Sequence, residues 1–374
     1  MKKALIVSAI IGFCASSVFA MTFTTGVGAK YGAMAGAGAA IVDDITCAYY
    51  NPAGITDTGR MELKIAAGAA TQGLNDIINA LGSSNDPAKF LADNFNKTVN
   101  ISGGFNSFIG INVAKIGLSV IPTANLYLNK PTAGTLNGTT MQASGGYEGL
   151  VTLGYSFKTP FVNIASLNVG ANIKSTNYAI GGSTVTGATS STDITATESG
   201  TAFDVGVKAK INTPVIPFSA GIVIRDINAT LKGNSQTNTT TYNPITGAAT
   251  TVTGSQTAAP DSTIGQTTVI GAATVIPVYN LKVAVDLDNI ADSSYIGTTV
   301  KGGNLTRIGL EYPVLGGILA LRAGQVSGNV ANSDVSQTTY GLGFQFGAVI
   351  NVAMMTDNKN SNNNSTMVDC GFAF

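Results

Sequence analysis

Apolar and polar residues alternate along most of the chain from Met61 onward. Between 281 and 288, for example, the odd-numbered residues are all leucine or valine, whereas the even-numbered ones are Lys282, Ala284, Asp286 and Asp288. The same rhythm recurs at 61–65, 167–174, 203–210 and 340–346. Since successive side chains of a strand point to opposite faces, this period of two predicts β-strands with one apolar and one polar face.

The alternating segments number fourteen, an even count. We expect strands at 61–71, 98–113, 115–129, 145–157, 164–181, 200–212, 216–231, 264–276, 279–290, 303–312, 317–328, 336–346, 348–356 and 366–374. Their connections are alternately short and long, as in barrels that cross a membrane. The long ones, notably 130–144, 182–199 and 232–263, are rich in Thr, Ser, Asn and Gly and are expected to be solvated, mobile loops. Within 72–97 the apolar spacing indicates either two short amphipathic helices or a loop packed on itself.

The composition indicates whether these strands lie in water or in a membrane. Charged residues make up only 11% of the chain and hydrophobic residues 44%, an unusual balance for a soluble protein. After residue 20, Gly, Pro or a charge interrupts each apolar run before it reaches the ~18 residues of a membrane helix. The sequence therefore predicts an all-β fold, a transmembrane antiparallel β-barrel of about 14 strands with charges inside and an apolar face in lipid. A soluble β-sandwich also alternates, but its polar face would be more densely charged.

Several functional classes are disfavoured. Lys+Arg and Asp+Glu both number 20, so no basic surplus would recruit nucleic acid. Histidine is absent, which removes the commonest general base and the commonest nitrogen ligand of metals. We therefore expect no enzyme, no metal centre and no cofactor.

The first residues are typical of a secretory signal. Lys2 and Lys3 precede an apolar run to Phe13, and Val18-Phe19-Ala20 places small residues where signal peptidase reads them. We expect three parts: a signal peptide at 1–20, an N-terminal plug at 21–60 and a transmembrane barrel at 61–374. The last strand ends in Phe374, which resembles the signal that the barrel-assembly machinery reads, and this machinery is an expected partner.

Two cysteines remain after the signal, Cys47 and Cys370. They can pair in an oxidising compartment, or they can be two small apolar residues, and the sequence leaves both readings open.

Residues 21–60 do not alternate. Glycines and alanines are interleaved from Gly26 to Ala40, a composition that lets a segment pack closely against other backbone inside a confined space. Asp43 or Asp44 can cap a short helix that runs through Tyr50, and Pro52 ends it. This segment is the predicted plug of the barrel.

The plug carries a family resemblance. After the small residues and Asp43-Asp44 comes Tyr49-Tyr50-Asn51-Pro52-Ala53-Gly54, which resembles the plug signature of the FadL/TodX family of outer-membrane channels for long-chain fatty acids and other hydrophobic compounds. Weaker echoes lie at 307–312 and 321–324. The resemblance assigns the hatch motif to Asn51, Pro52 and Ala53 and suggests Phe23 near the ligand pocket. Alternatively, Asn51-Pro52 only turns the chain towards the first strand.

The resemblance also implies a fourteen-stranded barrel with a hatch that shifts on ligand binding and a sideways exit at an interruption of the third strand. The third predicted strand contains Pro122. Proline cannot donate to the ladder, so in a closed barrel it leaves a carbonyl unpaired or forces a bulge. Pro122 is therefore the candidate lateral gate, unless the strand ends at Ile121.

A ligand that carries a carboxylate would need a cation among apolar neighbours, and Arg225, Arg307 and Arg322 are the inward-facing candidates. Each can instead pair with a lumen carboxylate such as Glu62, Asp286 or Glu311. The chain has no Trp, so Tyr127, Tyr155 and Tyr312 are expected at the membrane interfaces.

The leading functional hypothesis is passive uptake of long-chain fatty acids or other hydrophobic compounds at the cell outer membrane, with outer-membrane lipid around the barrel. The alternative is a barrel that resembles PorV or TraF and serves secretion or transfer machinery without transport. A polar porin is disfavoured because the plug would block its lumen.

Overall fold

The computed structural model describes residues 26–72, 95–158, 165–187, 190–211, 213, 216–242, 249–296, 298–359 and 363–373. The predicted signal peptide, Phe23 and most of the 72–97 segment lie outside these residues. The short helices are α2 (Ala29–Gly32), α3 (Cys47–Tyr50), η1 (Pro52–Thr56) and η2 (Leu315–Gly317).

The strands are of two kinds, long ones and short ones. The long ones are β1 (Met61–Gln72), β2 (Val99–Val113), β3 (Ile116–Lys130), β4 (Thr140–Lys158), β5 (Ala165–Gly187), β6 (Ser190–Ile211), β7 (Phe218–Tyr242), β11 (Thr267–Ile276), β12 (Leu281–Ile290), β15 (Gly303–Val314), β16 (Leu319–Val330), β17 (Ser333–Phe346), β18 (Ala348–Asp357) and β19 (Asn363–Ala373). The short ones are β8 (Ala249–Thr253), β9 (Thr257–Ala258), β10 (Ser262–Thr263), β13 (Ser293–Tyr295) and β14 (Thr298–Val300).

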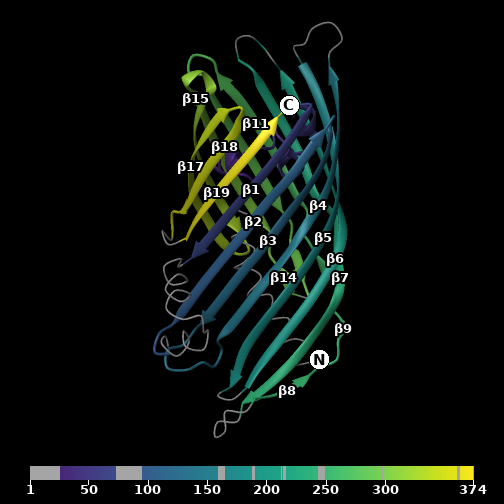
Figure 1. Ribbon diagram of the computed structural model, residues 1–374, viewed down its shortest axis with the longest axis vertical. Helices are drawn as coiled ribbons and strands as arrows, with labels where there is room; N and C mark the ends of the chain where they lie inside the picture. The colour runs from purple at the N-terminus through teal and green to yellow at the C-terminus, as the bar shows by residue number, and fades with distance from the viewer. Residues whose placement is uncertain are drawn as a thin grey trace.

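The long strands form a closed antiparallel barrel (Figure 1). Each pairs with its neighbour in chain order, β7 pairs directly with β11, and β12 pairs directly with β15. Closure comes from β1, which pairs with β2 on one edge and with β19 on the other. The predicted all-β barrel of fourteen strands is thus confirmed.

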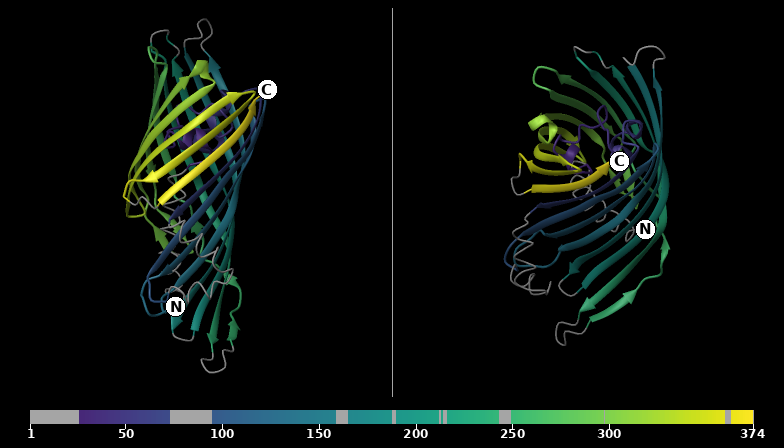
Figure 2. Two further views of the ribbon diagram at one scale, coloured as in Figure 1. Left: turned by 60° about the vertical axis from the view of Figure 1, so that its left-hand side comes forward. Right: turned by 45° about the horizontal axis from the view of Figure 1, so that its top comes forward.

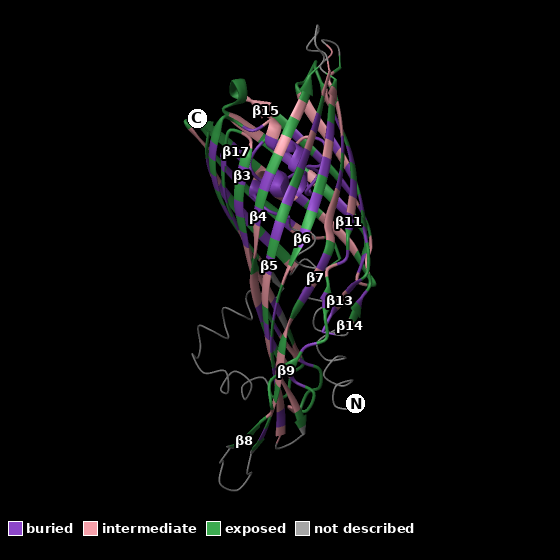
Figure 3. Ribbon diagram, turned by 90° about the vertical axis from the view of Figure 1, so that its right-hand side faces the viewer, coloured by how far each residue is buried: buried purple, intermediate pink, exposed green. Residues whose placement is uncertain are grey.

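Strands β4 to β7 are longer than the alternation predicts (Figure 3). The segments 182–187, 190–199 and 232–242, expected to belong to mobile loops, are paired strand, for example Gly182 with Ile194 and Ile194 with Thr237. Threonine favours strands, and a paired neighbour satisfies the backbone of a polar segment as well as that of an apolar one. The prediction of loops there was wrong because it rested on polarity alone.

Buried and exposed residues alternate along the strands of the barrel (Figure 3), and their side chains have the predicted chemistry. In β1, Leu63 and Ile65 are exposed on the outer face, whereas Glu62 and Lys64 are buried inside. Tyr155 and Tyr312 lie on the outer face, but Tyr127 is buried, so its expected place at an interface was wrong. None of the helices in the described residues is both long enough and apolar enough to cross a membrane.

Residues 26–57, called the inner segment from here on, lie inside the barrel (Figure 2). The segment comprises α2, α3, η1 and the turns between them, and nearly all of its residues are buried. Cys47 of this segment is buried and Cys370 lies on β19, and both thiols are free, so no disulfide joins them.

The barrel wall accommodates the inner segment through inward-facing glycines. A Cβ on Gly206 would lie 2.0 Å from the Asn51 side-chain oxygen, and one on Gly170 would lie 2.3 Å from the Pro52 carbonyl. Real Cβ atoms do not approach so closely, so only glycine fits. Among the residues that meet the segment in this way are eight that we call the wall glycines: Gly154, Gly170, Gly206, Gly221, Gly271, Gly309, Gly324 and Gly341. Several are direct cross-strand neighbours, as Gly154, Gly170 and Gly206 are.

Candidate functional site

A cavity of about 150 Å³ lies between the inner segment and the barrel wall. The inner segment contributes Val27, Ala48 and Tyr49 to its lining. The wall adds apolar and aromatic side chains, among them Ile121, Leu150, Tyr178, Leu231, Ile264, Ile290 and Tyr295, and polar and charged side chains line the rest. A concave, largely apolar site with a few polar groups is the usual form of a small-molecule pocket.

A bulge in β7 brings two charges into this cavity together. The pairing of β6 with β7 shifts register twice between Thr201 and Val205. On β7, Asp226 and Asn228 adopt positive φ angles of 61° and 55°, which non-glycine residues seldom adopt. Because of the bulge, the consecutive residues Arg225 and Asp226 both line the cavity, whereas in a regular strand they would face opposite sides.

Ion pairs hold most of the charges near the cavity. Lys174 lies 2.7 Å from Asp226, 3.4 Å from Asp204 and 3.5 Å from Glu148. Arg307 binds Asp288 through Nε at 2.8 Å and donates to the Ala35 carbonyl at 3.0 Å.

Arg225 differs from these cations. Its guanidinium lies over the Tyr49 ring, 4.9 Å from the centroid, and donates from Nη1 to the Tyr49 carbonyl at 3.3 Å. It forms no ion pair within the described residues, and its buried Nε has no acceptor there. A buried donor without a partner costs about 1–3 kcal/mol, so the site is incomplete at this atom.

The three predicted ligand-binding arginines separate into different places. Arg225 and Arg307 line the cavity. Arg322 does not belong to its lining: it binds Glu311 at 2.7 Å and Asn351 at 2.8 Å elsewhere in the lumen. Pairing with a lumen carboxylate was the alternative reading, and the partners are Asp288 for Arg307 and Glu311 for Arg322. Sequence reasoning missed Tyr178, Tyr295 and Asp226, because neither alternation nor composition shows which inward residues surround an open space.

The predicted hatch motif lies at the centre of the contact between inner segment and wall. Asn51 is fully buried, and its side-chain oxygen accepts a hydrogen bond from the Ala53 N–H at 3.0 Å, which caps η1. Its Nδ2 donates to the Ala39 carbonyl at 2.8 Å and to the Val207 carbonyl of β6 at 3.2 Å. Pro52 is the first residue of η1, where its missing N–H is not needed. Asn51 therefore joins two turns of the inner segment to the barrel, besides turning the chain.

Buried carboxylates of the wall hold the rest of the inner segment. Asp369 accepts from the N–H groups of Ala29 and Lys30 at 2.6 and 3.1 Å. Asp286 accepts from those of Gly38 and Ala39, each at 2.9 Å. Each of these two carboxyl groups accepts hydrogen bonds from two consecutive backbone N–H groups, so both fix the backbone of the inner segment to the wall.

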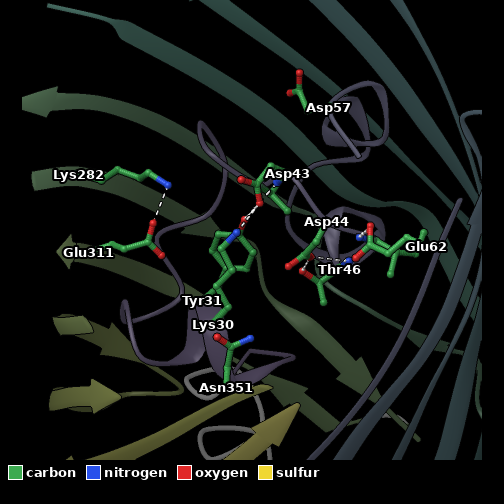
Figure 4. A network of polar contacts seen from close by, with 12 residues as sticks. Lys30, Tyr31, Asp43, Asp44, Thr46, Asp57, Glu62, Lys282, Glu311 and Asn351 are labelled. Carbon is green, nitrogen blue, oxygen red and sulfur yellow. Dashed lines mark hydrogen bonds and ion pairs between the residues drawn. The ribbon is translucent and has the colours of Figure 1, made fainter. Parts of the chain in front are cut away.

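Ion pairs add to this anchoring (Figure 4). Lys30 pairs with Asp43 at 2.5 Å within the inner segment, and Lys64 of β1 pairs with Asp44 at 2.6 Å. Burial alone would raise the pKa of Asp44, but the charges of Lys64 and then Lys30 outweigh it, and its pKa lies below the ordinary value. Asp44 is therefore ionised at neutral pH and links β1 to the inner segment.

The ladder between β2 and β3 is interrupted beside the cavity. Residue pairing runs from Val99–Lys130 to Asn106–Thr123 and resumes at Ile109–Val120, in the same register. The two pairs left out involve Pro122 and Ile121. On the cavity side, Ile121 and Thr123 belong to the lining. Strand β3 continues to Lys130, so the alternative in which it ends at Ile121 is wrong.

Within the described residues, no group of three or more Cys, Asp or Glu side chains is arranged to hold a metal ion. The arrangement is a small cavity lined by apolar and charged side chains, next to the interruption in the β2–β3 ladder.

No protein-family model and no curated protein matches the chain. Solved structures do. The toluene transporter TbuX of Ralstonia pickettii is 12% identical with a TM-score of 0.54, over 93% of this chain and 97% of that one. The toluene transporter TodX of P. putida is 13% identical with a TM-score of 0.54, over 94% and 99%. A FadL homologue of Pseudomonas aeruginosa is 10% identical with a TM-score of 0.55, over 94% and 98%. Over nearly its whole length, the chain therefore has the barrel fold of the TodX- and FadL-type channels.

Proposed function

We propose that this protein is a FadL/TodX-family channel of the cell outer membrane that takes up hydrophobic compounds passively, and that it is not an enzyme. The observation that carries the proposal is the apolar cavity enclosed between the inner segment and a wall whose ladder is interrupted at the same level. Structures with this fold include transporters of toluene, which supports a hydrophobic cargo. The apolar outer face would contact outer-membrane lipid, after insertion by the barrel-assembly machinery.

No energy source is required for such uptake. Transfer of apolar surface from water into the cavity is favourable by roughly 25 cal/mol per Å², and onward transfer into lipid retains that gain. The inner segment fills part of the lumen, and under this proposal the ligand leaves through the wall instead of along the barrel axis.

The contacts support a route by which ligand would move the hatch. Arg225 holds the Tyr49 ring and carbonyl. Tyr49 stacks edge-on against Tyr50 at 5.0 Å, and the Tyr50 hydroxyl bonds both the N–H and the carbonyl of Val27, at 3.2 and 3.0 Å. A ligand that displaces Tyr49 or Arg225 would disturb the start of the inner segment, while the wall glycines and buried carboxylates keep the remainder in place.

The gap at Pro122 supports lateral exit. A ligand beside Ile121 lies against the stretch of wall where β2 and β3 are not bonded, and opening that stretch breaks fewer hydrogen bonds than opening any intact pair of strands. The cargo would leave directly into the lipid that surrounds the barrel.

Binding of labelled toluene and labelled palmitate to the purified barrel tests the proposal. We expect saturable binding of at least one of them, abolished when Ala48 at the cavity floor is replaced by Phe. Replacing Leu321, on the outer face, by Phe serves as the control and should leave binding unchanged. A barrel that binds neither compound would instead support the alternative role in secretion or transfer machinery.

A further inference from the structure

A small chamber opens beside the main cavity and has unmet hydrogen-bonding capacity. Its volume is about 20 Å³, and Tyr49, Arg225, Asp288 and Arg307 belong to the linings of both spaces. Two buried polar atoms of these shared residues lack partners among the described residues: Nε of Arg225, a donor, and Oδ1 of Asp288, an acceptor. One water-sized group fits in such a volume, since a water needs roughly 10–15 Å³ by this measure.

The main cavity fits one ring. Drug-sized ligands occupy pockets of roughly 300–1,000 Å³, whereas a cavity of about 150 Å³ takes up benzene in another protein. The volume here is about 150 Å³. A long alkyl chain would have to extend out of the cavity. Tyr178 and Tyr295 add aromatic surface, which favours stacked or edge-on contact with a ring.

The charges disfavour an anionic head group. Asp226 and Asp288 line the main cavity together with Arg225, and Asp288 also lines the small chamber. A ligand carboxylate near Arg225 would also lie close to these two carboxylates in a site of low dielectric, where like charges repel. A hydroxyl, by contrast, is neutral and both donates and accepts, which matches one orphaned acceptor and one orphaned donor.

From these observations we infer that the site takes a single-ring aromatic compound with a hydroxyl group, of the phenol class, with the ring in the main cavity and the hydroxyl between Arg225 and Asp288. This inference rests on the proposed function and narrows its cargo. The hydroxyl accepts from Arg225 Nε, donates to Asp288 Oδ1 and replaces the water that the small chamber can hold.

Calorimetric binding of phenol, anisole, toluene, benzoate and palmitate to the purified full chain tests the inference. Anisole keeps the oxygen but cannot donate, so the comparison needs no variant. We expect phenol to bind at least tenfold more tightly than toluene and anisole, and more tightly than benzoate. Equal affinities of phenol and toluene, or tighter binding of benzoate, would overturn the inference and leave the proposed function intact. Failure of all five to bind would overturn both.

A variant of Arg225 tests where the hydroxyl group of the ligand binds. Arg225→Met removes the Nε donor but keeps an apolar side chain of similar length. The ratio of toluene to phenol dissociation constants should fall at least tenfold in this variant. Lys232→Met, which removes an exposed cation outside the cavity, should keep the wild-type ratio. An unchanged ratio in Arg225→Met would place the hydroxyl elsewhere and overturn the assignment.

Discussion

Asn51 is the residue that joins most parts of the inner structure, because its one amide bonds the start of η1, the Ala39 turn and strand β6. Replacing it by Ala leaves two carbonyls and one N–H without their partner inside the barrel. We expect the inner segment to lose about 1–3 kcal/mol of local stability. Amide hydrogen exchange at 38–54 should accelerate accordingly. Asn289→Ala removes an amide whose bond to Asn304 lies on the outside and is the matched control; equal exchange in both variants would contradict the role of Asn51.

Asp44 predicts how the inner segment responds to acid. Its folded pKa is lowered, so its ion pair stabilises fully above the unfolded value of about 3.9 and this stabilisation is lost as pH falls below it. Hydrogen exchange of residues 43–47 should therefore be insensitive to Asp44 between pH 7 and pH 5, after correction for the intrinsic rate, and should accelerate towards pH 3. Asp44→Asn should remove that acid transition; a transition of the same size in the variant would assign it to other groups.

At the scale of single residues, the sequence predicted those features that depend only on the chemistry of the residue itself. Pro122 cannot donate, and the ladder is interrupted beside it. The importance of Arg225 could not be predicted in the same way. Its place depends on a bulge without glycine or proline, at which Asp226 and Asn228 adopt positive φ, and it forms no ion pair within the described residues; both features depend on the tertiary structure.

At the scale of elements, β5 and β6 show how the wall receives the inner segment. A Cβ at Gly206 would clash with Asn51, whereas one at Gly181 of β5 would have no atom within 4 Å. We expect Gly206→Ala to displace the segment and raise ion conductance in planar bilayers several-fold. Gly181→Ala should conduct like the wild type. If both variants conduct equally, the wall glycines are not what keeps the lumen sealed.

Strand β3 carries the proposed exit, and Pro122→Ala supplies the donor that the ladder lacks. Closing the gap should slow transfer of bound ligand into lipid by about tenfold, equivalent to ~1.4 kcal/mol at the barrier, with equilibrium binding unchanged. Pro313→Ala, in β15 where the ladder with β16 is uninterrupted, is the control. Stopped-flow transfer from protein to labelled vesicles measures the rate. Exit unaffected by Pro122→Ala would rule out this gate.

The strand boundaries show what alternation can and cannot reveal. Most long strands lie within three residues of their predicted bounds, because a lipid-facing strand must alternate between apolar and polar residues. The ends of β5, β6 and β7 were missed because beyond the apolar band both faces can be polar, so the pattern disappears although the pairing continues. In the sequence, the wall glycines stand at inward positions of the alternation. The reason that these positions are glycine is the close packing of the inner segment against them.

At the scale of the whole molecule, two chemistries are arranged concentrically. Apolar side chains face outward and ion pairs face inward, and the small-residue inner segment fills part of the lumen (Figure 2). On β5 and β6, the inward face carries Ile180, Ile194 and Ala196, which pack with Ala259 and Ile296. Tyr178, next to this cluster, lines the cavity, so apolar surface continues from the extended strands to the site.

The central claim is that a hydrophobic molecule occupies the cavity between the inner segment and the wall. A crystal structure with bromobenzene, read through the anomalous signal of bromine, tests it most directly. The account predicts a bromine peak inside the barrel, bounded by Ile121, Tyr178 and Tyr49. Bromine found only on the outer face, with solvent in the cavity, would contradict it.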